Sequence, residues 1–233
     1  MKSFTKFKKF FLIIGGIILA LAGIAAAAFP TASKAYYDYS KDALISRWNE
    51  YVKEQEPPEN RLSLSLAQTG SISLNNDGLI EEDAMAIFNI DELVKEMAGV
   101  VTIEKISLVA PILTGIDASN LSIGICELLG SQSPGNIGNY CLAGHKSKIY
   151  GKQFNRLIEV DLNDELKIYN GYETFIYEVY DRFTVKAEEA WPLENVYNDS
   201  IITLVTSDYT QTPIGRFIVK ARLVNSATAA SAQ

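Results

Sequence analysis

An apolar run near the N-terminus limits the folds that are open to this chain. Residues 10–29, FFLIIGGIILALAGIAAAAF, carry no charged side chain. A helix over this run would be about 30 Å long at 1.5 Å per residue, which matches the hydrocarbon core of a bilayer. The run is therefore expected to lie in a membrane, apart from the domain that the rest of the chain forms.

The charges beside the run predict its orientation. The charged residues that precede it are all lysines, at Lys2, Lys6, Lys8 and Lys9. By the positive-inside rule the N-terminus stays in the cytoplasm, and the chain after Pro30 lies outside the cell membrane as the body of a single-pass protein. The small residues that end the run also fit a cleavable signal peptide. Both alternatives export the body.

Composition excludes several classes of protein. Hydrophobic residues make up 48% of the 233 residues and charged residues 21%, which is typical of a globular domain and unlike a disordered or polytopic membrane protein. The net charge is −7, and the body is more acidic still because the first four lysines lie outside it. An acidic body repels a phosphate backbone, so no nucleic-acid partner is expected.

Helical spacing follows the apolar run. Apolar residues recur at intervals of three, four and seven between residues 34 and 55, and Pro57 and Pro58 end the pattern, which predicts a stalk helix. These residues are Tyr37, Leu44, Trp48, Tyr51 and Val52. Residues 56–80 read as a linker with one candidate edge strand. Asp91 is expected to cap a short helix, ELVKEMA, that Gly99 ends.

From residue 100 onwards the chain alternates between short β-type segments and turns. The segments are VVTIEKISLV, LSIGICELL, NYCLAGH, LIEVDL, ELKIYN, TFIYEVYDRFTV, IITLVT and RFIVKARLV. Turn residues separate them at Pro134-Gly135, Asn163-Asp164 and Asn170-Gly171. About eight strands without a long helix between them predict a mainly β fold, closed or nearly closed into a barrel.

The chain thus divides into five expected parts. They are a cytoplasmic basic segment (1–9), a transmembrane anchor (10–29), an extracellular stalk and linker (30–99), the β-barrel (100–225) and a polar tail (226–233).

Cys126 and Cys141 are too few for a disulfide framework. Each is expected to be a small buried residue on or near a strand, and a single bridge between them is the alternative. The aromatic residues between positions 172 and 183 are expected to pack in the core and on the sheet faces. No glycine-rich phosphate loop or metal-ligand spacing occurs, so the sequence calls for no cofactor, and calcium binding is not established.

Three polar residues could carry chemistry. His145, the single histidine, follows a strand in CLAGHK; Ser207 ends the segment TLVTSD; and Arg216 opens the last strand. Together they could supply a proton carrier, a nucleophile and a cation that stabilises an oxyanion. Arg222 is the competitor to Arg216. It would lie about 20 Å away along a regular strand and is expected to be a surface charge.

The strings TLVTSDYTQTPIGRFIVKARL and PGNIGNYCLAGHKS resemble the catalytic core of the sortases, the membrane-anchored cysteine transpeptidases of Gram-positive bacteria. The resemblance extends over about residues 100–224 and implies an eight-stranded β-barrel. It also implies cleavage of an LPxTG-like sorting signal between Thr and Gly, and transfer of the protein to a cell-wall or pilin amine. His145, Ser207 and Arg216 match the family's catalytic positions, and Thr206 is a candidate for substrate contact or for a structural role.

Serine at position 207 departs from the family, which has a cysteine there. A hydroxyl needs a base during attack, and no acid is evidently placed to orient His145 as one, so this chain is expected to be nearly inactive. The serine is either an engineered Cys→Ser change or natural. A module that binds sorting signals without cleaving them and a serine-using transpeptidase or hydrolase are the rival functions.

The subclass is read from what surrounds the barrel. The chain has no Asp-Pro dipeptide of the kind found in the lid of pilin-polymerising sortases, and its C-terminal tail is polar. These features favour the housekeeping (class A) type or a related class with a single anchor.

Overall fold

The computed structural model describes residues 2–55 and 90–228, with side chains from residue 14 onwards. Three α-helices are described: α1 (Lys2–Gln55), α4 (Ile90–Glu96) and α5 (Ala118–Ile123). The strands are β1 (Met97–Ile103), β2 (Leu108–Thr114), β3 (Ile125–Glu127), β4 (Gly138–Ala143), β5 (Glu165–Tyr169), β6 (Glu173–Lys186), β7 (Ser200–Asp208) and β8 (Gly215–Thr228). Short 3₁₀ helices are η1 (Glu104–Ile106), η2 (Phe154–Glu159) and η3 (Trp191–Leu193).

The strands form a closed barrel in the order β1-β2-β3-β4-β7-β8-β6-β5, as the sequence predicted. Strands β2 and β3 pair in parallel, as do β4 and β7, and the remaining neighbours are antiparallel. Alternate side chains point inward and fill the barrel, with Tyr140, Phe154 and Tyr177 among the largest that are fully buried.

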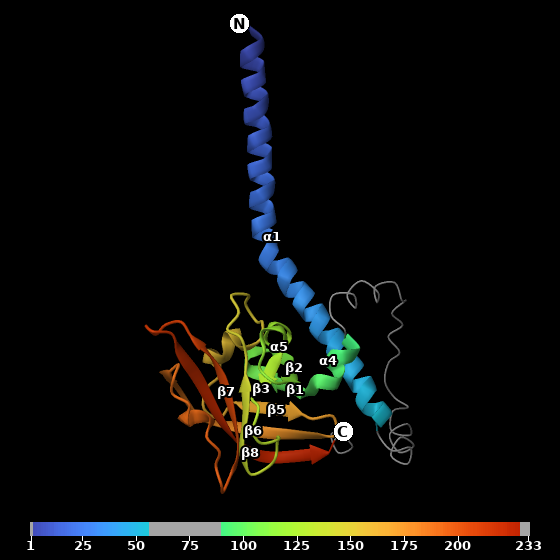
Figure 1. Cartoon of the computed structure of the whole chain (residues 1–233), viewed down its shortest axis with the longest axis vertical. Coiled ribbons are helices and arrows are strands. Elements are labelled where there is room, and N and C mark those ends of the chain that lie inside the picture. Colours follow the sequence, from blue (N-terminus) through green and yellow to red (C-terminus); the bar gives the residue numbers. More distant parts are fainter. Residues whose placement is uncertain (1, 56–89, 229–233) are drawn as a thin grey trace.

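A single helix joins the anchor to the stalk. The sequence predicted two helices, but α1 continues through Pro30. Proline in a helix interior removes one backbone hydrogen bond and usually bends the helix. Figure 1 shows that α1 changes direction between its projecting N-terminal part and the part beside the barrel. By length and composition α1 could cross a membrane, a test that a signal sequence also passes.

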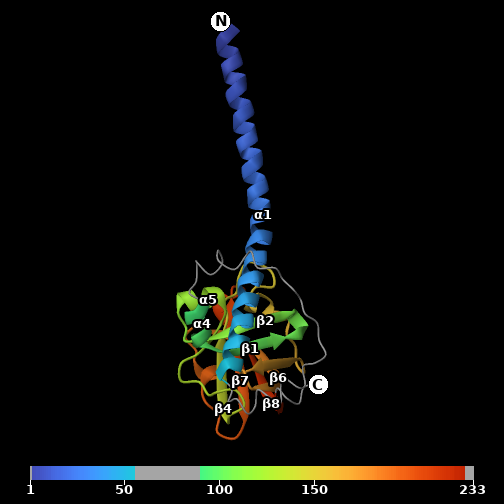
Figure 2. The ribbon, with the colours of Figure 1, turned by 90° about the vertical axis from the view of Figure 1, so that its right-hand side faces the viewer.

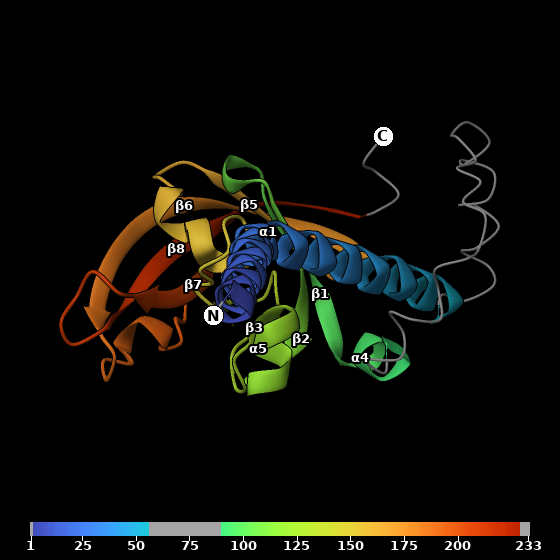
Figure 3. The same ribbon diagram turned by 90° about the horizontal axis from the view of Figure 1, so that it is seen from above.

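The stalk half of α1 packs on the outside of the barrel (Figures 2 and 3). Leu44, Trp48 and Val52, spaced four residues apart, are buried in a cluster with Val100 and Leu113, which point outward from β1 and β2. The Trp48 ring meets Tyr169 edge-on, with 5.8 Å between centroids. The predicted stalk helix is therefore also a covering layer of the fold.

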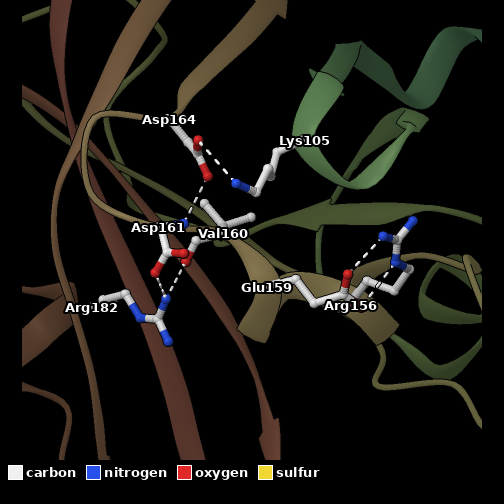
Figure 4. A network of polar contacts seen from close by, with 7 residues as sticks. All are labelled: Lys105, Arg156, Glu159, Val160, Asp161, Asp164 and Arg182. Carbon is white, nitrogen blue, oxygen red and sulfur yellow. Dashed lines mark hydrogen bonds and ion pairs between the residues drawn. The ribbon is translucent and has the colours of Figure 1, made fainter.

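The segment LIEVDL does not form the predicted strand. Residues 154–159 form the 3₁₀ helix η2, and Phe154, Leu157 and Val160 are fully buried at intervals of three, which is the period of a 3₁₀ helix. Figure 4 shows the polar contacts that hold it, including Arg156 with Glu159 (2.6 Å) and Arg182 with the carbonyl of Val160 (2.8 Å). Lys105 lies 3.9 Å from Asp164 in the same network.

The strand count stays at eight because the segment VVTIEKISLV is two strands. The helix η1 and Ser107, with a left-handed φ of 52°, separate β1 from β2. In the segment LSIGICELL, only residues 125–127 form a strand, because Asp117 caps the preceding helix α5 by accepting the Asn120 backbone N–H at 2.8 Å.

The short helix before the barrel differs in its ends from the prediction. It starts at Ile90, so Asp91 lies in its first turn rather than at the cap, and it ends at Glu96. Gly99 lies inside β1, where a Cβ atom would be 2.4 Å from the Tyr169 carbonyl oxygen. Close approach of two strands, not a helix end, requires this glycine. The candidate edge strand in the linker lies outside the described residues.

Both cysteines are buried on strands, as predicted, and their sulfurs are free, so the alternative of a disulfide is wrong. Of the aromatic residues in and beside β6, Phe175 and Tyr177 lie in the core. Tyr180 is exposed on the sheet face beneath Arg222, 4.9 Å from the ring centroid to the guanidinium carbon.

Candidate active site

Strand register brings the three predicted catalytic residues to one end of the barrel wall. Ser207 is the register partner of Arg216 in the antiparallel pair of β7 and β8. Ala143, the last residue of β4, is opposite Val205 in the parallel pair of β4 and β7. His145 lies two residues after Ala143, and Ser207 lies two residues after Val205. Neighbouring strands lie about 4.8 Å apart, so Ser207 and Arg216 are neighbours on β7 and β8, and His145 follows the end of β4, the strand on the other side of β7.

The alternation along the strands places Ser207 and Arg216 on the outer face of the barrel. Leu204 of β7 and Phe217 of β8 point into the core, and side chains at odd distances from them point the other way. Ser207 and Arg216 are half-buried, while His145 is exposed. The candidate site is thus built on the outside of a rigid wall.

Thr206 connects the serine strand to the histidine turn. Its hydroxyl donates to the carbonyl oxygen of Gly144 at 2.9 Å, and the Gly144 N–H donates to Val205 at 3.0 Å. Thr206 is buried and faces the opposite side of β7 from Ser207. This hydrogen bond fits the structural role that the sequence left open, and substrate contact by Thr206 stays a prediction.

The two arginines of β8 have different surroundings. Arg216 donates only to the neighbouring carbonyl of Gly215, at 3.3 Å, and no described carboxylate lies within ion-pair distance of it. Arg222 forms an ion pair with Asp199 at 2.5 Å and lies over the Tyr180 ring. The charge of Arg216 is therefore available to an anion beside Ser207, whereas Arg222 is a paired surface residue.

No carboxylate in the described part of the chain hydrogen-bonds to His145. The nearest acid in sequence to Ser207 is Asp208, whose side chain points inward. It accepts hydrogen bonds from the Thr210 hydroxyl (2.7 Å) and the Thr184 hydroxyl (2.9 Å). The Thr210 bond above all lowers the pKa of Asp208, with smaller contributions from Thr184 and the charge of Lys146.

Sequence reasoning did not find the role of Asp208 in shaping the turn after β7. The signal was present, because an aspartate two residues before a threonine in a turn is the pattern of an Asx-turn. The Thr210 backbone N–H donates to Asp208 at 2.9 Å, as that pattern requires.

The segment between β6 and β7 was missed as well. It folds onto the outer face of β4 and β7, where the buried Asn139 amide donates to the carbonyls of Pro192 (3.1 Å) and Glu194 (3.0 Å). Trp191 stacks on Phe183 with 5.0 Å between centroids. This segment forms a border to the outer face that carries Ser207.

Neither cysteine replaces a thiol at position 207. Burial raises the pKa of both Cys126 and Cys141 to about 12, so their thiols stay protonated near neutral pH. Cys141 is opposite Thr203, four residues before Ser207 on β7, which is about 13 Å at 3.3 Å per residue. The site has a hydroxyl, an imidazole and a guanidinium, a set suited to acyl transfer. Within the described residues, no cluster of three metal-ligating side chains occurs.

Comparison with known proteins assigns this chain to a family. The family model described as "Sortase domain" matches residues 101–224, more than half of the chain. Sortase A of Bacillus anthracis is 26% identical over 132 residues, covering 57% of this chain and 62% of the relative. Sortase D of Bacillus subtilis (strain 168) is 31% identical over 84 residues, covering 36% of this chain and 40% of the relative. The matches span less than two thirds of either relative.

The solved structures give the same fold. A Sortase D5 transpeptidase of Clostridium perfringens superposes with a TM-score of 0.57 at 21% identity, covering 80% of this chain and 99% of that one. At this identity the likeness concerns the fold, an eight-stranded barrel preceded by a long N-terminal helix, and it confirms that part of the prediction.

Proposed function

This chain belongs to the sortase family, and from that premise we propose that it is the scaffold of a membrane-tethered transpeptidase for LPxTG-like sorting signals. The observation that carries the proposal is that Ser207 and Arg216 are register partners on β7 and β8, while His145 follows the end of β4, the other neighbour of β7. A scissile carbonyl above Ser207 would have a proton donor on one side and an unpaired cation on the other.

The proposed reaction has two steps. In the first, residue 207 loses its proton to His145 and bonds to the Thr carbonyl carbon, and Arg216 stabilises the oxyanion. The Thr–Gly bond then breaks as His145 gives that proton to the leaving amine. In the second, an amine of the cell wall or of a pilin attacks the acyl-enzyme. A new amide bond forms, and residue 207 leaves with a proton.

Serine is a poor nucleophile in this setting. A thiol can ionise beside a protonated histidine, whereas a hydroxyl must lose its proton to a base as it attacks. No described carboxylate orients His145 for that task, in contrast to a serine hydrolase triad. We therefore propose that the chain with Ser207 is nearly inactive. The same feature favours the second candidate function, a module that binds sorting signals without cleaving them.

We also propose that residues 10–29 of α1 anchor the barrel outside the cell membrane with the N-terminus in the cytoplasm. The helix has the length and composition for this, and its lysines precede the apolar run. Protease added to intact spheroplasts should then digest the barrel and leave an N-terminal fragment in the membrane. The finding of one candidate membrane helix among the described residues also supports a housekeeping or related single-anchor class.

The test of the transpeptidase proposal compares the full chain with its Ser207→Cys variant on a quenched LPxTG-type peptide plus an amine. Activity only in the cysteine variant supports a sortase with a disabled nucleophile. Equal activity in both makes Ser207 a working nucleophile. If neither reacts across a panel of peptides but both bind them, the binding module is the better description.

A further inference from the structure

The loop that carries His145 returns to its own starting point. Residues 144–153 leave the end of β4, and Gln153 pairs across an isolated β-bridge with Lys146, the neighbour of His145. Asn155 closes the loop further by donating to the Ser147 carbonyl at 2.5 Å. The position of His145 therefore depends on how firmly Gln153 is held.

Gln153 is held in an unusual conformation. Its φ of 50° and ψ of −135° lie in a region that residues other than glycine rarely adopt, and the residue is only 1% exposed. Its side-chain amide donates to the carbonyls of Leu121 (2.6 Å) and Gly124 (3.1 Å) beside α5. Such strain persists only where the surroundings over-determine the conformation, and it often marks functional sites.

The stalk part of α1 supplies one of those surroundings. The Lys152 ammonium lies 4.7 Å from the centroid of the Tyr37 ring, and a Cβ on Gly151 would be 3.5 Å from Cε of Lys34. Tyr37 is buried, which raises its pKa, and its hydroxyl lies against the Gln153 backbone without a well-formed hydrogen bond. Helix α1 thus contacts Lys152 and lies against Gln153, at the point where the His145 loop closes.

A pocket borders this connection. A cavity of about 240 Å³ lies beside Tyr37 and Leu44 of α1, with Ile123 of α5 and Lys152 also in its lining. The Tyr37 ring therefore meets Lys152 at the edge of this pocket, and it adds a contact to the hydrogen bonds that hold the Gln153 side chain. Further along α1, Trp48 and Val52 pack near Gly171 and the outer faces of β1 and β2, remote in sequence from the loop.

We infer that Tyr37 is a positioning residue for His145, so that docking of the tether helix helps to set the geometry of the candidate active site. The inference rests on the proposed function, since it gives His145 its role. Loss of the Tyr37 ring frees Lys152 and lets Gln153 relax from its strained conformation. The Lys146–Gln153 bridge then opens, and His145 loses its fixed position.

The first experiment observes the loop without any need for activity. His145 is the single histidine, so its ring signals in NMR spectra of the full chain in lipid nanodiscs need no assignment. Hydrogen exchange of the Lys146 and Gln153 amides reports the bridge. Tyr37→Ala should accelerate exchange at these amides by about tenfold or more, as expected for local opening, and should sharpen and average the ring signals.

Matched variants separate positioning from general stability. Val52→Ala loosens the same helix at its far end and should lower the unfolding temperature without faster exchange in the loop. Tyr37→Phe keeps the ring and should behave like the unmodified chain. Tyr37→Leu keeps apolar volume for the case in which Tyr37→Ala does not fold. Unchanged exchange and unchanged ring signals in a folded Tyr37→Ala or Tyr37→Leu variant would overturn the inference.

The second experiment measures turnover in the Ser207→Cys background. Tyr37→Ala should lower kcat by about tenfold to a hundredfold, because a displaced catalytic group slows the chemical step, and KM should change little. An equal kcat would contradict the inference. If Ser207→Cys itself is inactive on all peptides, the proposed function fails, and the histidine signals still decide the role of Tyr37.

Discussion

Two outer faces of the barrel differ in the residues that they carry and in what packs on them. The face of β1 and β2 carries Val100 and Leu113, which α1 and α4 cover. The open face, formed by β4, β7 and β8, carries Ser207 and Arg216 at one end, with the exposed His145 beside them, while the segment that contains η3 packs on it at Asn139, near the other end of β4. Both follow from the same alternation of side chains along a strand. The apolar outward residues Val100 and Leu113 pack against the covering helices, whereas the end of the other face that carries Ser207 and Arg216 stays partly accessible.

The comparison predicts that a change on the covered face affects stability and spares chemistry. Trp48→Ala removes the buried ring with which α1 packs against Tyr169. It should lower the free energy of unfolding by about 3–5 kcal/mol. Urea denaturation of the full chain in detergent micelles measures this. Arg47→Ala, which removes an exposed residue paired with Glu50 and Asp91, is the control and should cost less than about 1 kcal/mol. Similar losses in both variants would mean that the covering layer is not packed as described.

On the open face, we expect a substitution to reduce activity and to leave stability almost unchanged. In the Ser207→Cys background, Arg216→Ala should lower kcat/KM by about a hundredfold to a thousandfold, because an oxyanion would lose its cation. The unfolding free energy should be almost unchanged, since Arg216 has no ion pair with a described carboxylate. Arg222→Ala, on the same strand face but paired with Asp199, is the matched control. If it reduces activity as much as Arg216→Ala, the assignment of the two arginines is wrong.

Thr206 is expected to affect both stability and activity, because its side chain is buried and its hydrogen bond to Gly144 supports the candidate site. Thr206→Val keeps the shape but leaves the Gly144 carbonyl without its donor, which should cost about 1–2 kcal/mol of stability and also reduce kcat. Thr206→Ser keeps the hydroxyl and should retain most of both. A Thr206→Val variant with full activity would show that the hydrogen bond does not help to place His145.

The smallest expected effect is on the stability of the folded chain at low pH. The folded chain lowers the pKa of Asp208, so the unfolded chain binds more protons at low pH. The stabilisation by Asp208 is present above its unfolded pKa of about 3.9 and is lost as pH falls through the lower folded value. Asp208→Asn should therefore make stability less dependent on pH below about pH 4. An unchanged acid slope in chemical denaturation at several pH values would contradict this.

Predictions from the sequence were most accurate where a single residue type or a single period of apolar residues determines the structure. It predicted the barrel, the positions of both cysteines and the helix that contains Trp48 and Leu44. It failed at residues 157–162, which form no strand: residues 157–159 end the 3₁₀ helix η2, in which buried residues recur with a period of three. It placed Asp91 and Gly99 at helix ends that lie elsewhere, because helix boundaries depend on neighbours that a local pattern does not include.

For the site, sequence identified residues but not their connections. The arrangement of residues 145, 207 and 216 depends on the pairing of β4 with β7, strands separated by more than fifty residues. The contacts of Thr206 with Gly144, of Asn139 with Pro192 and of Tyr37 with Lys152 are long-range in the same sense. No local pattern encodes such pairs, although buried polar residues such as Asn139 are expected to have partners.

The central claim is that position 207 on the open face is where the acyl group is attached. Intact-protein mass spectrometry after incubation of Ser207→Cys with an LPxTG-type peptide, without an added amine, tests this directly. The account predicts a mass increase equal to the peptide fragment that ends in Thr less one water, mapped by fragmentation to residue 207 and absent from the Ser207→Cys, His145→Ala double variant. An adduct on Cys126 or Cys141, or no adduct while the peptide is cleaved, would contradict it.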